Sequence, residues 1–301
     1  MNLNQLRFFL SIAETGSVTR SAELLHLSQP ALTRGIRQLE EELGVSLFQR
    51  LPRAMRLTRF GTSFLRHAQS VFVQLENAQA ELQHLSQRTE DEIVIGSGPT
   101  WTMGGLAEIV GSVLRTYPNI SIKVRTGYDQ QLADMLRSGE VDFALTDISR
   151  DPDKDDLSQE PLIHCQYVVA CRNDHPLAGE KNVSLERLLA FPWAMPDRAL
   201  SAYDRLAGLF RAESLPVPLP LLQSTSFNFI LRLLETSDAL SFVVESSLQT
   251  PYQNPIVAVD MEVPLPTRHA GIVMRPDSWI SPATEALIDQ LRTHCKQNPI
   301  Q

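Results

Sequence analysis

The chain has 301 residues, enough for two or three domains of ordinary size, and its composition of 43% hydrophobic and 21% charged residues is typical of a globular protein. No stretch approaches the run of about 20 apolar residues that a membrane helix needs, and the N-terminus lacks the basic and then apolar order of a secretory signal. We therefore expect a cytoplasmic protein without a membrane partner. The three cysteines, Cys165, Cys171 and Cys295, are too scattered for a disulfide framework or a zinc site, so we expect reduced, buried thiols.

Charge is divided unevenly along the chain. Residues 1–66 hold nine arginines and no lysine against five glutamates, whereas residues 91–301 hold 17 basic and 27 acidic side chains. This asymmetry suggests a small nucleic-acid-facing end on a larger acidic body. Arginine is also the residue best suited to paired hydrogen bonds with phosphate or guanine.

Three short helices are predicted near the N-terminus. Apolar residues at helical spacing indicate a first helix that ends at Gly16. Ser17 is placed to cap a second helix over 18–25, and Ser28 a third over 29–43. Two short helices joined by a tight turn are typical of a helix-turn-helix.

The third helix has two distinct faces. Its predicted inward stripe consists of Leu32, Ile36, Leu39 and Leu43. The opposite, N-terminal half carries the side chains that we predict to face DNA: Gln29, Pro30, Thr33, Arg34 and Arg37. A helix that enters the major groove needs short or planar hydrogen-bonding groups near its N-terminus, where the base edges are within reach. The alternative is a set of packed helices with a solvated polar face.

A two-stranded hairpin is predicted next, with strands over 47–50 and 55–58. Arg50, Arg53 and Arg56 would line this wing and contact phosphates, which fixes the register on DNA without reading sequence. A merely solvated charged hairpin is the alternative.

A long helix is then predicted from a cap at Thr58 to about residue 88. It carries apolar residues at alternating spacings of four and three: Phe64, Ala68, Val71, Leu75, Ala78, Leu82 and Leu85. Such a heptad seam needs a second helix to cover it, so we expect a dimer formed through residues 59–88. Packing on the body of the same chain remains the alternative.

In order and wording these segments resemble the LysR-type transcriptional regulators. The similarity is strongest in AELLHLSQPALTRGIRQLEEELGVSLF and in LTRFGTSFLRHA, and it continues more loosely through the whole chain. The resemblance implies that the helix beginning at SQPALT enters the major groove. It also implies a homotetramer, which the heptad seam alone does not.

The resemblance further implies a multidomain fold: an all-α winged helix-turn-helix with a long linker helix, then a two-lobed α/β domain like the periplasmic binding proteins. The winged helix-turn-helix would occupy 1–58 and the linker 59–88. Alternating strand and helix patterns after residue 91 favour a largely parallel sheet. We expect a discontinuous lobe I over 91–162 and 267–301, with lobe II over 163–266.

Ligands of open α/β sheets bind beyond the carboxyl ends of the strands. The loops at those ends supply our candidate effector contacts: Ser97, Gly98, Thr100, Thr126, Tyr128, Thr146, Asp147, Arg198, Ser224 and Ser226. Serine and threonine at such places can equally be plain helix caps. Arg198 or Arg125 would suit an acidic effector and Asp147 or Asp197 a hydroxylated or cationic one, so the sequence leaves the effector open.

The function expected is that of a sequence-specific DNA-binding transcriptional regulator controlled by a small-molecule effector bound between the two lobes. Its expected partners are double-stranded promoter DNA, further copies of the chain, the effector and RNA polymerase, with no cofactor and no metal. An enzyme is the main alternative, but no glycine-rich phosphate loop, metal-ligand pair or nucleophile motif is present. A solute-binding transport protein is a further alternative, which would explain the two lobes but not the helix-turn-helix.

Overall fold

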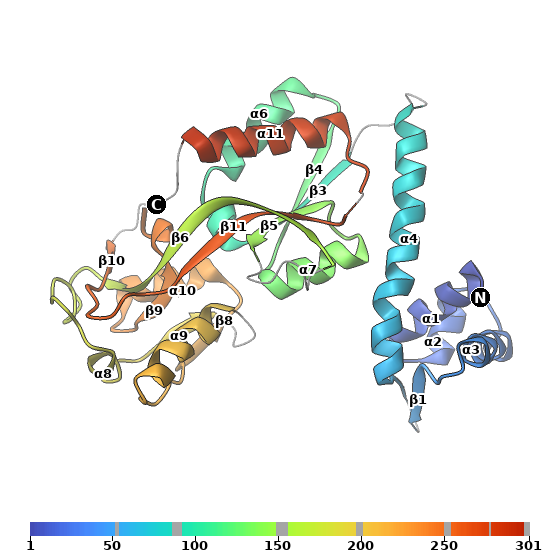
Figure 1. Ribbon diagram of the computed structural model, residues 1–301, viewed down its shortest axis with the longest axis horizontal. Helices are drawn as coiled ribbons and strands as arrows, with labels where there is room; N and C mark the ends of the chain where they lie inside the picture. The colour runs from blue at the N-terminus through green and yellow to red at the C-terminus, as the bar shows by residue number, and fades with distance from the viewer. Residues whose placement is uncertain are drawn as a thin grey trace. The chain divides into compact units, whose positions relative to one another are not determined.

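The computed structural model describes residues 1–51, 54–85, 92–148, 156–196, 201–249, 254–276 and 278–297. The chain forms two compact units, one over Met1–Ser86 and one that begins at Gln87 (Figure 1). None of the described residues belongs to a helix with the length and apolarity needed to cross a bilayer.

The first unit is a helical head with a hairpin and one long helix. Its elements are α1 (Leu3–Thr15), α2 (Val18–Leu24), α3 (Gln29–Leu43), β1 (Phe48–Leu51), β2 (Ala54–Leu57) and α4 (Arg59–Leu85).

The helix boundaries in the head follow the predicted caps. The Ser17 hydroxyl accepts a hydrogen bond from the backbone of α2, and the Ser28 hydroxyl does the same for α3. Gly16 ends α1 and Gly44 ends α3, with φ values of 65° and 69° that favour glycine. The helix-turn-helix is therefore encoded by local signals.

Aromatic packing forms the centre of the head. Phe9 is fully buried, and its ring centroid lies 5.2 Å from that of Phe48 in the wing and 5.0 Å from that of Phe64 in α4. The predicted stripe of α3 is buried as far as Leu39, but Leu43, the last residue of the helix, is 36% exposed. The inward face thus ends one turn earlier than expected.

The predicted heptad seam of α4 has two different parts. Phe64 and Ala68 pack into the core of the head. Val71, Leu75 and Leu82 are 38%, 41% and 67% exposed. The start of the seam therefore stabilises the head, and only its later part is left uncovered. The Leu85 side chain and residues 86–88 lie outside the description.

The second unit is an α/β domain. Its elements, in order, are β3 (Glu92–Ser97), α5 (Pro99–Met103), α6 (Leu106–Thr116), β4 (Ser121–Thr126), α7 (Asp129–Ser138), β5 (Phe143–Asp147), β6 (Ser158–Arg172), α8 (Leu185–Leu188), β7 (Ala194–Pro196), α9 (Ser201–Ala212), β8 (Leu222–Ser224), α10 (Phe227–Thr236), β9 (Ser241–Val244), the 3₁₀ helix η2 (Glu245–Gln249), β10 (Ile256–Ala258), β11 (Thr267–Met274) and α11 (Pro282–Gln297).

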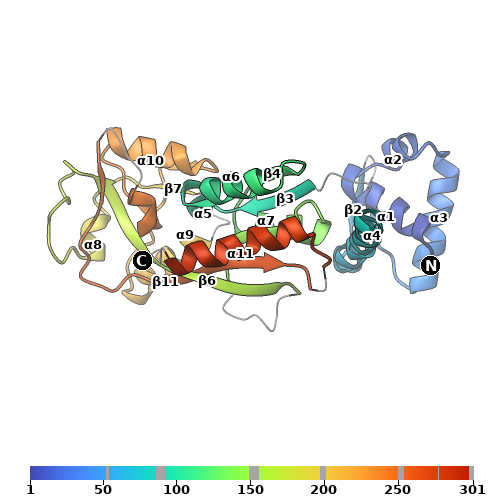
Figure 2. The ribbon, with the colours of Figure 1, turned by 90° about the horizontal axis from the view of Figure 1, so that it is seen from above.

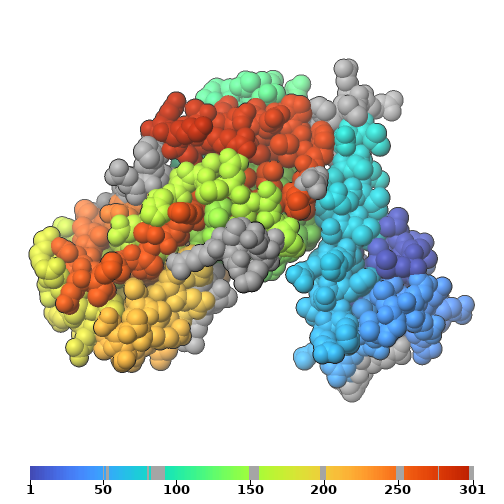
Figure 3. All heavy atoms as spheres, in the orientation of Figure 1, coloured from blue at the N-terminus to red at the C-terminus, as the bar shows by residue number. Residues whose placement is uncertain are grey.

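The first lobe contains the predicted parallel strands. β3 pairs in parallel with β4 on one side and β5 on the other, and β11 returns antiparallel beside β5. Helices α6 and α11 lie side by side on one face of this sheet, and α7 lies on the other (Figures 1 and 2). The side chains of α11 form a continuous band on the surface of the domain (Figure 3).

After β3, where the sequence pattern predicts one helix that ends near Thr116, the structure has two. These are α5 and α6, because Gly104 has an extended backbone between them. A Cβ atom at Gly105 would lie 2.3 Å from Nε2 of His294 in α11, so the glycine allows α11 to approach closely.

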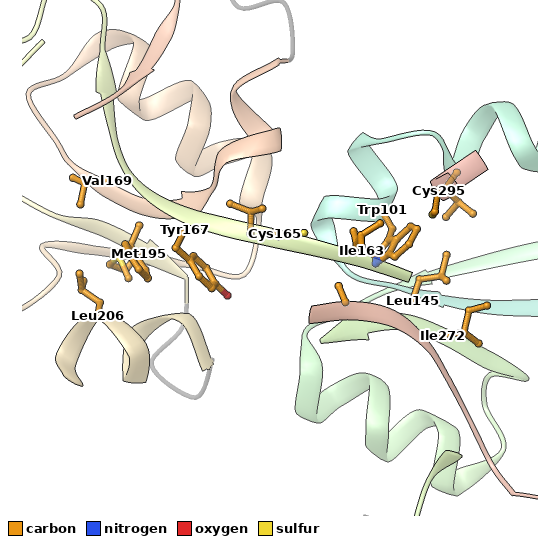
Figure 4. Close-up of a cluster of buried hydrophobic side chains, with 14 of the residues drawn as sticks. Trp101, Leu145, Ile163, Cys165, Tyr167, Val169, Met195, Leu206, Ile272 and Cys295 are labelled. Atoms are coloured by element: carbon orange, nitrogen blue, oxygen red, sulfur yellow. The ribbon is translucent and has the colours of Figure 1, made fainter. Parts of the chain in front are cut away.

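β6 connects the two lobes as one uninterrupted strand. Its first part pairs with β11, and its later residues pair with β9 and β10. Figure 4 shows Ile163 beside Trp101 and Leu145, and Tyr167 on the side of the second lobe. The domain boundary expected at residues 162/163 therefore falls inside a single strand, whereas the sequence pattern predicts a strand only over 167–171. In the second lobe β7 and β8 form a separate parallel pair, and β8 and β10 were not predicted.

We expect Gly271→Ala to destabilise the second unit strongly. A Cβ atom there would lie 2.0 Å from the carbonyl oxygen of Glu160 and 2.8 Å from the backbone nitrogen of Leu162, so the paired strands β11 and β6 would have to separate. The loss should be about 3 kcal/mol or more. Urea unfolding followed by tryptophan fluorescence reports this unit alone, since all three tryptophans lie in it.

Gly208→Ala is the matched control. Gly208 lies inside α9, and a Cβ atom there meets nothing within 4 Å. This variant should gain about 0.5–1 kcal/mol from helix propensity. Equal unfolding midpoints for the two variants would contradict the close approach of β11 to β6 at Gly271.

Candidate functional site

The predicted DNA-facing side chains of α3 share one exposed surface. Gln29, Pro30, Arg34 and Arg37 are exposed and Thr33 is half-buried. The amide nitrogen of Gln29 donates a hydrogen bond of 2.9 Å to the Thr19 hydroxyl in α2. The helix-turn-helix therefore presents one continuous polar face at the N-terminal half of α3.

A groove of about 380 Å³ lies between this face and the wing. Thr19, Gln29 and Thr33 line one side, and Leu51 and Ala54 line the other. The wing is attached to the head by a 2.8 Å hydrogen bond from the Met55 backbone to the Gly16 carbonyl. Of the predicted wing contacts, Arg56 is exposed. Arg53 and the side chain of Arg50 lie outside the description.

In the second unit, a buried carboxylate joins side chains from both lobes. Asp147, at the end of β5, accepts a 2.8 Å hydrogen bond from Nη1 of Arg268 and a 2.7 Å bond from Nη1 of Arg205. The side chains of Asp147, Arg268 and Arg205 are only 7%, 10% and 15% exposed. Arg268 belongs to β11 and Arg205 to α9, so Asp147 joins three elements.

Both arginines stay charged in this environment. Burial opposes the charged form of the Arg268 guanidinium, but the surrounding groups, Asp147 first among them, together outweigh it and raise the pKa of Arg268 above its ordinary value. Burial likewise opposes the charge of Arg205, and Asp147 together with the groups around it outweighs burial and raises the pKa of Arg205. Nη2 of Arg268 further donates to the Thr100 hydroxyl at 2.6 Å, and Nη1 of Arg205 donates to the Tyr167 hydroxyl at 3.2 Å.

A second carboxylate, Asp129, is held beside the first. It accepts a 3.1 Å hydrogen bond from the Thr146 hydroxyl and another from the Ser201 hydroxyl. Ser201 also lies 3.3 Å from Asp147. The two aspartates and two arginines thus balance each other's charge inside the cleft.

Tyr128 makes a further contact between the lobes. Its hydroxyl donates a 3.1 Å hydrogen bond to the carbonyl of Thr225. Burial, with a contribution from the Asp129 charge, raises the pKa of Tyr128 to about 12, so the phenol is neutral at physiological pH.

Two cavities adjoin Tyr128. The inner one has about 50 Å³ and is lined by residues that include Thr100, Thr146 and Arg268, so it has room for little more than water. The outer one has about 430 Å³, and its lining contains no charged side chain. The residues that line it are Pro99, Thr102, Met103, Thr126, Gly127, Tyr128, Gln131, Thr225, Ser226, Phe227 and Asn228. Only the outer cavity has the size of an ordinary ligand site.

The structure brings most of the predicted effector residues to these cavities. Six of these residues line one cavity or both: Gly98, Thr100, Thr126, Tyr128, Thr146 and Ser226. Asp147 lines neither cavity, but it bonds to Arg268, which lines the inner one. Ser97 is fully buried and bonds to Gly98 and Thr102, and Ser224 accepts from the Ser226 backbone, so both side chains act locally. Arg198 lies outside the described residues.

The charged and hydroxyl groups around Asp147 include four residues that were not among the predicted contacts: Asp129, Ser201, Arg205 and Arg268. Arg125, one of the two arginines considered for an acidic effector, is exposed on the edge strand β4. The sequence offered one signal for two of the missed residues. Ser201 and Arg205 are four residues apart in α9, and that spacing places them on the same face of the helix.

Comparison with known proteins agrees with this architecture. Residues 3–62 match the bacterial regulatory helix-turn-helix protein of the lysR family, and residues 86–296 match the LysR substrate binding domain. The regulator PcaQ of Agrobacterium fabrum is 28% identical over 294 residues, which cover 97% of this chain and 94% of PcaQ. The RuBisCO operon transcriptional regulator of Allochromatium vinosum is 28% identical, with 98% and 99% covered.

Solved structures share the fold over the whole chain. A cysteine-to-aspartate variant of full-length OxyR from Pseudomonas aeruginosa has a TM-score of 0.63 at 24% identity and covers 97% of this chain and 95% of its own. Full-length CbnR complexed with its target DNA has a TM-score of 0.60 at 20% identity, with 97% and 99% covered.

The chain belongs to the LysR family of transcriptional regulators. It is a DNA-binding regulator with an N-terminal helix-turn-helix and a two-lobed, effector-binding substrate domain. The relatives named above are regulators and not enzymes.

We expect Asp147→Asn to destabilise the second unit by about 3 kcal/mol, because it leaves two buried guanidinium groups without their counter-charge. Asp289→Asn is the control, because Asp289 also pairs with an arginine, Arg292 on α11, but its side chain is 64% exposed. It should cost less than about 0.5 kcal/mol. Urea unfolding measures both, and a loss at Asp147 no larger than that at Asp289 would show that the buried pair is not a determinant of stability.

Proposed function

We propose that this regulator reads promoter DNA with the N-terminal half of α3, contacts phosphates with the wing, and binds its effector in the outer cavity between the lobes. The observation that carries the DNA assignment is the polar face of α3, exposed over Gln29, Arg34 and Arg37 while the opposite face is buried in the head. Side chains at that place reach base edges when a helix lies in the major groove.

The effector assignment is supported by the charge balance of the cleft. Asp147 and Asp129 already have hydrogen-bond partners from both lobes. These carboxylates, beside the inner cavity, therefore need no ligand to balance their charge. The outer cavity offers neutral polar groups beside the apolar surfaces of Tyr128 and Phe227. A ligand there would contact both lobes next to the Tyr128–Thr225 hydrogen bond and so could favour one arrangement of the lobes.

Self-association is supported by uncovered apolar surface. On α4 the exposed seam residues are Val71, Leu75, Ala78 and Leu82. We propose that this seam pairs with the same helix of a second copy. The second unit has further exposed apolar side chains, Leu114 and Val124 in one lobe and Leu221 and Phe229 in the other. Contacts through both units would give the expected homotetramer, and RNA polymerase would receive the signal at the promoter.

Arg34→Ala and Arg56→Ala should have different effects on DNA binding. If Arg34 reads a base, its loss should cost about 1–3 kcal/mol on the preferred sequence and relax specificity at one position. If Arg56 contacts a phosphate, its loss should weaken all sequences alike and reduce the slope of log affinity against log salt by about 1. Fluorescence anisotropy over a salt series measures both, and the opposite ordering would overturn the two roles.

Placing charges on the seam of α4 should separate the copies. We expect the double variant Leu75→Glu/Leu82→Glu to lower the oligomeric state in sedimentation velocity, because four like charges would meet in each helix pair. Ser70→Glu is the control, since Ser70 is exposed and lies off the seam. An unchanged sedimentation coefficient for the double variant would contradict pairing through α4.

A further inference from the structure

Thr19 and Gln29 meet across the turn of the helix-turn-helix. Thr19 is the second residue of α2 and Gln29 the first of α3, and the amide nitrogen of Gln29 donates to the Thr19 hydroxyl at 2.9 Å. Both residues are exposed, and both line the groove between α3 and the wing. The contact therefore lies on the surface proposed to face DNA, and one partner lies outside α3.

The turn fixes the distance between the two residues. The backbone of Leu27 donates to the carbonyl of Ala22 at 2.8 Å, and His26 adopts a left-handed φ of 53°. Ala22 and Leu32, one on each helix, are both buried in the core of the head. The Thr19 hydroxyl thus has a defined position relative to the start of α3.

A hydrogen bond to this hydroxyl limits what the Gln29 amide can offer to a base. A free glutamine rotates about three side-chain bonds and can present either end of its amide. When one N–H is directed to Thr19, the amide presents its carbonyl oxygen and one remaining N–H. That pair matches adenine, which has an N6 donor beside an N7 acceptor in the major groove. Guanine offers two acceptors there, and the carbonyl oxygen would repel them.

We propose that Thr19 is a positioning residue that holds the Gln29 amide for a bidentate pair with adenine. A residue of α2 thereby sets the base preference of α3. This inference rests on the proposed function, because it needs Gln29 to face the major groove. It predicts that loss of the Thr19 hydroxyl changes which base is preferred at one position, a change that a phosphate contact or a purely structural role would not produce.

The test is selection from a randomised DNA duplex library, with sequencing, on the full-length protein and four variants. Gln29→Ala identifies the position in each half-site that depends on Gln29. Thr19→Val and Thr19→Ala remove the hydroxyl, and Thr19→Ser keeps it. Because Thr19 is exposed, we expect these variants to fold, which thermal unfolding of each protein checks.

We expect wild type to prefer adenine at the Gln29-dependent position by about tenfold or more, the worth of a good bidentate pair. Thr19→Val and Thr19→Ala should lower that preference by at least about threefold, with the other positions unchanged, because the amide regains its freedom. Thr19→Ser should retain the preference.

Three results would overturn the inference while leaving the DNA-binding assignment intact. They are an unchanged adenine preference in Thr19→Val, an equal loss of affinity for all sequences, and a Gln29-dependent position that prefers another base. If the wild-type protein selects no motif, or if Gln29→Ala changes no position, the proposed function itself fails and the inference with it.

Discussion

The arrangement of the second unit depends on one buried carboxylate with two guanidinium partners. Asp147 ends the central parallel strand β5 of the first lobe and receives Arg268 from β11 and Arg205 from the second-lobe helix α9. A buried charge is costly unless it is paired, so these elements must stay together around Asp147. The same pairing balances the buried charges, and the larger cavity is lined by neutral polar and apolar groups alone. The proposed ligand site therefore lies beside the charged cluster and does not include it.

The first unit uses a single amphipathic helix for two purposes. Near its start, α4 contributes Phe64 and Ala68 to the core of the head, which holds the helix-turn-helix and the wing in place. Farther along, the same seam is exposed at Leu75 and Leu82, where a second copy can cover it. Since a dimer places two recognition helices on one duplex, pairing through α4 would couple the geometry of the copies to the spacing of two half-sites. The proposed roles of α3 and α4 are therefore connected through the core around Phe9.

Features encoded by local sequence could be predicted, and features made by distant pairs could not. Ser17, Ser28 and Gly44 set helix ends by bonding to neighbouring backbone, so the helices of the head were recovered within a residue or two. The loops after β3 and β4 and the carboxyl end of β5 lie at the cavities, as expected, because parallel strands share an edge. Arg268 was missed because its partner Asp147 is 121 residues away, and Arg205 because 58 residues separate it from the same carboxylate. The full length of β6 was missed as well, since its pairing with β11 depends on a return of the chain that periodicity does not reveal.

The most direct measurement is a genome-wide pull-down of DNA fragments with the purified full-length protein at near-physiological salt. The account predicts enrichment of a few intergenic sites that share a partly palindromic motif, because two α3 helices related by symmetry would read two similar half-sites. Recovery of fragments without sequence preference, or of none, would contradict the claim that the first unit reads DNA.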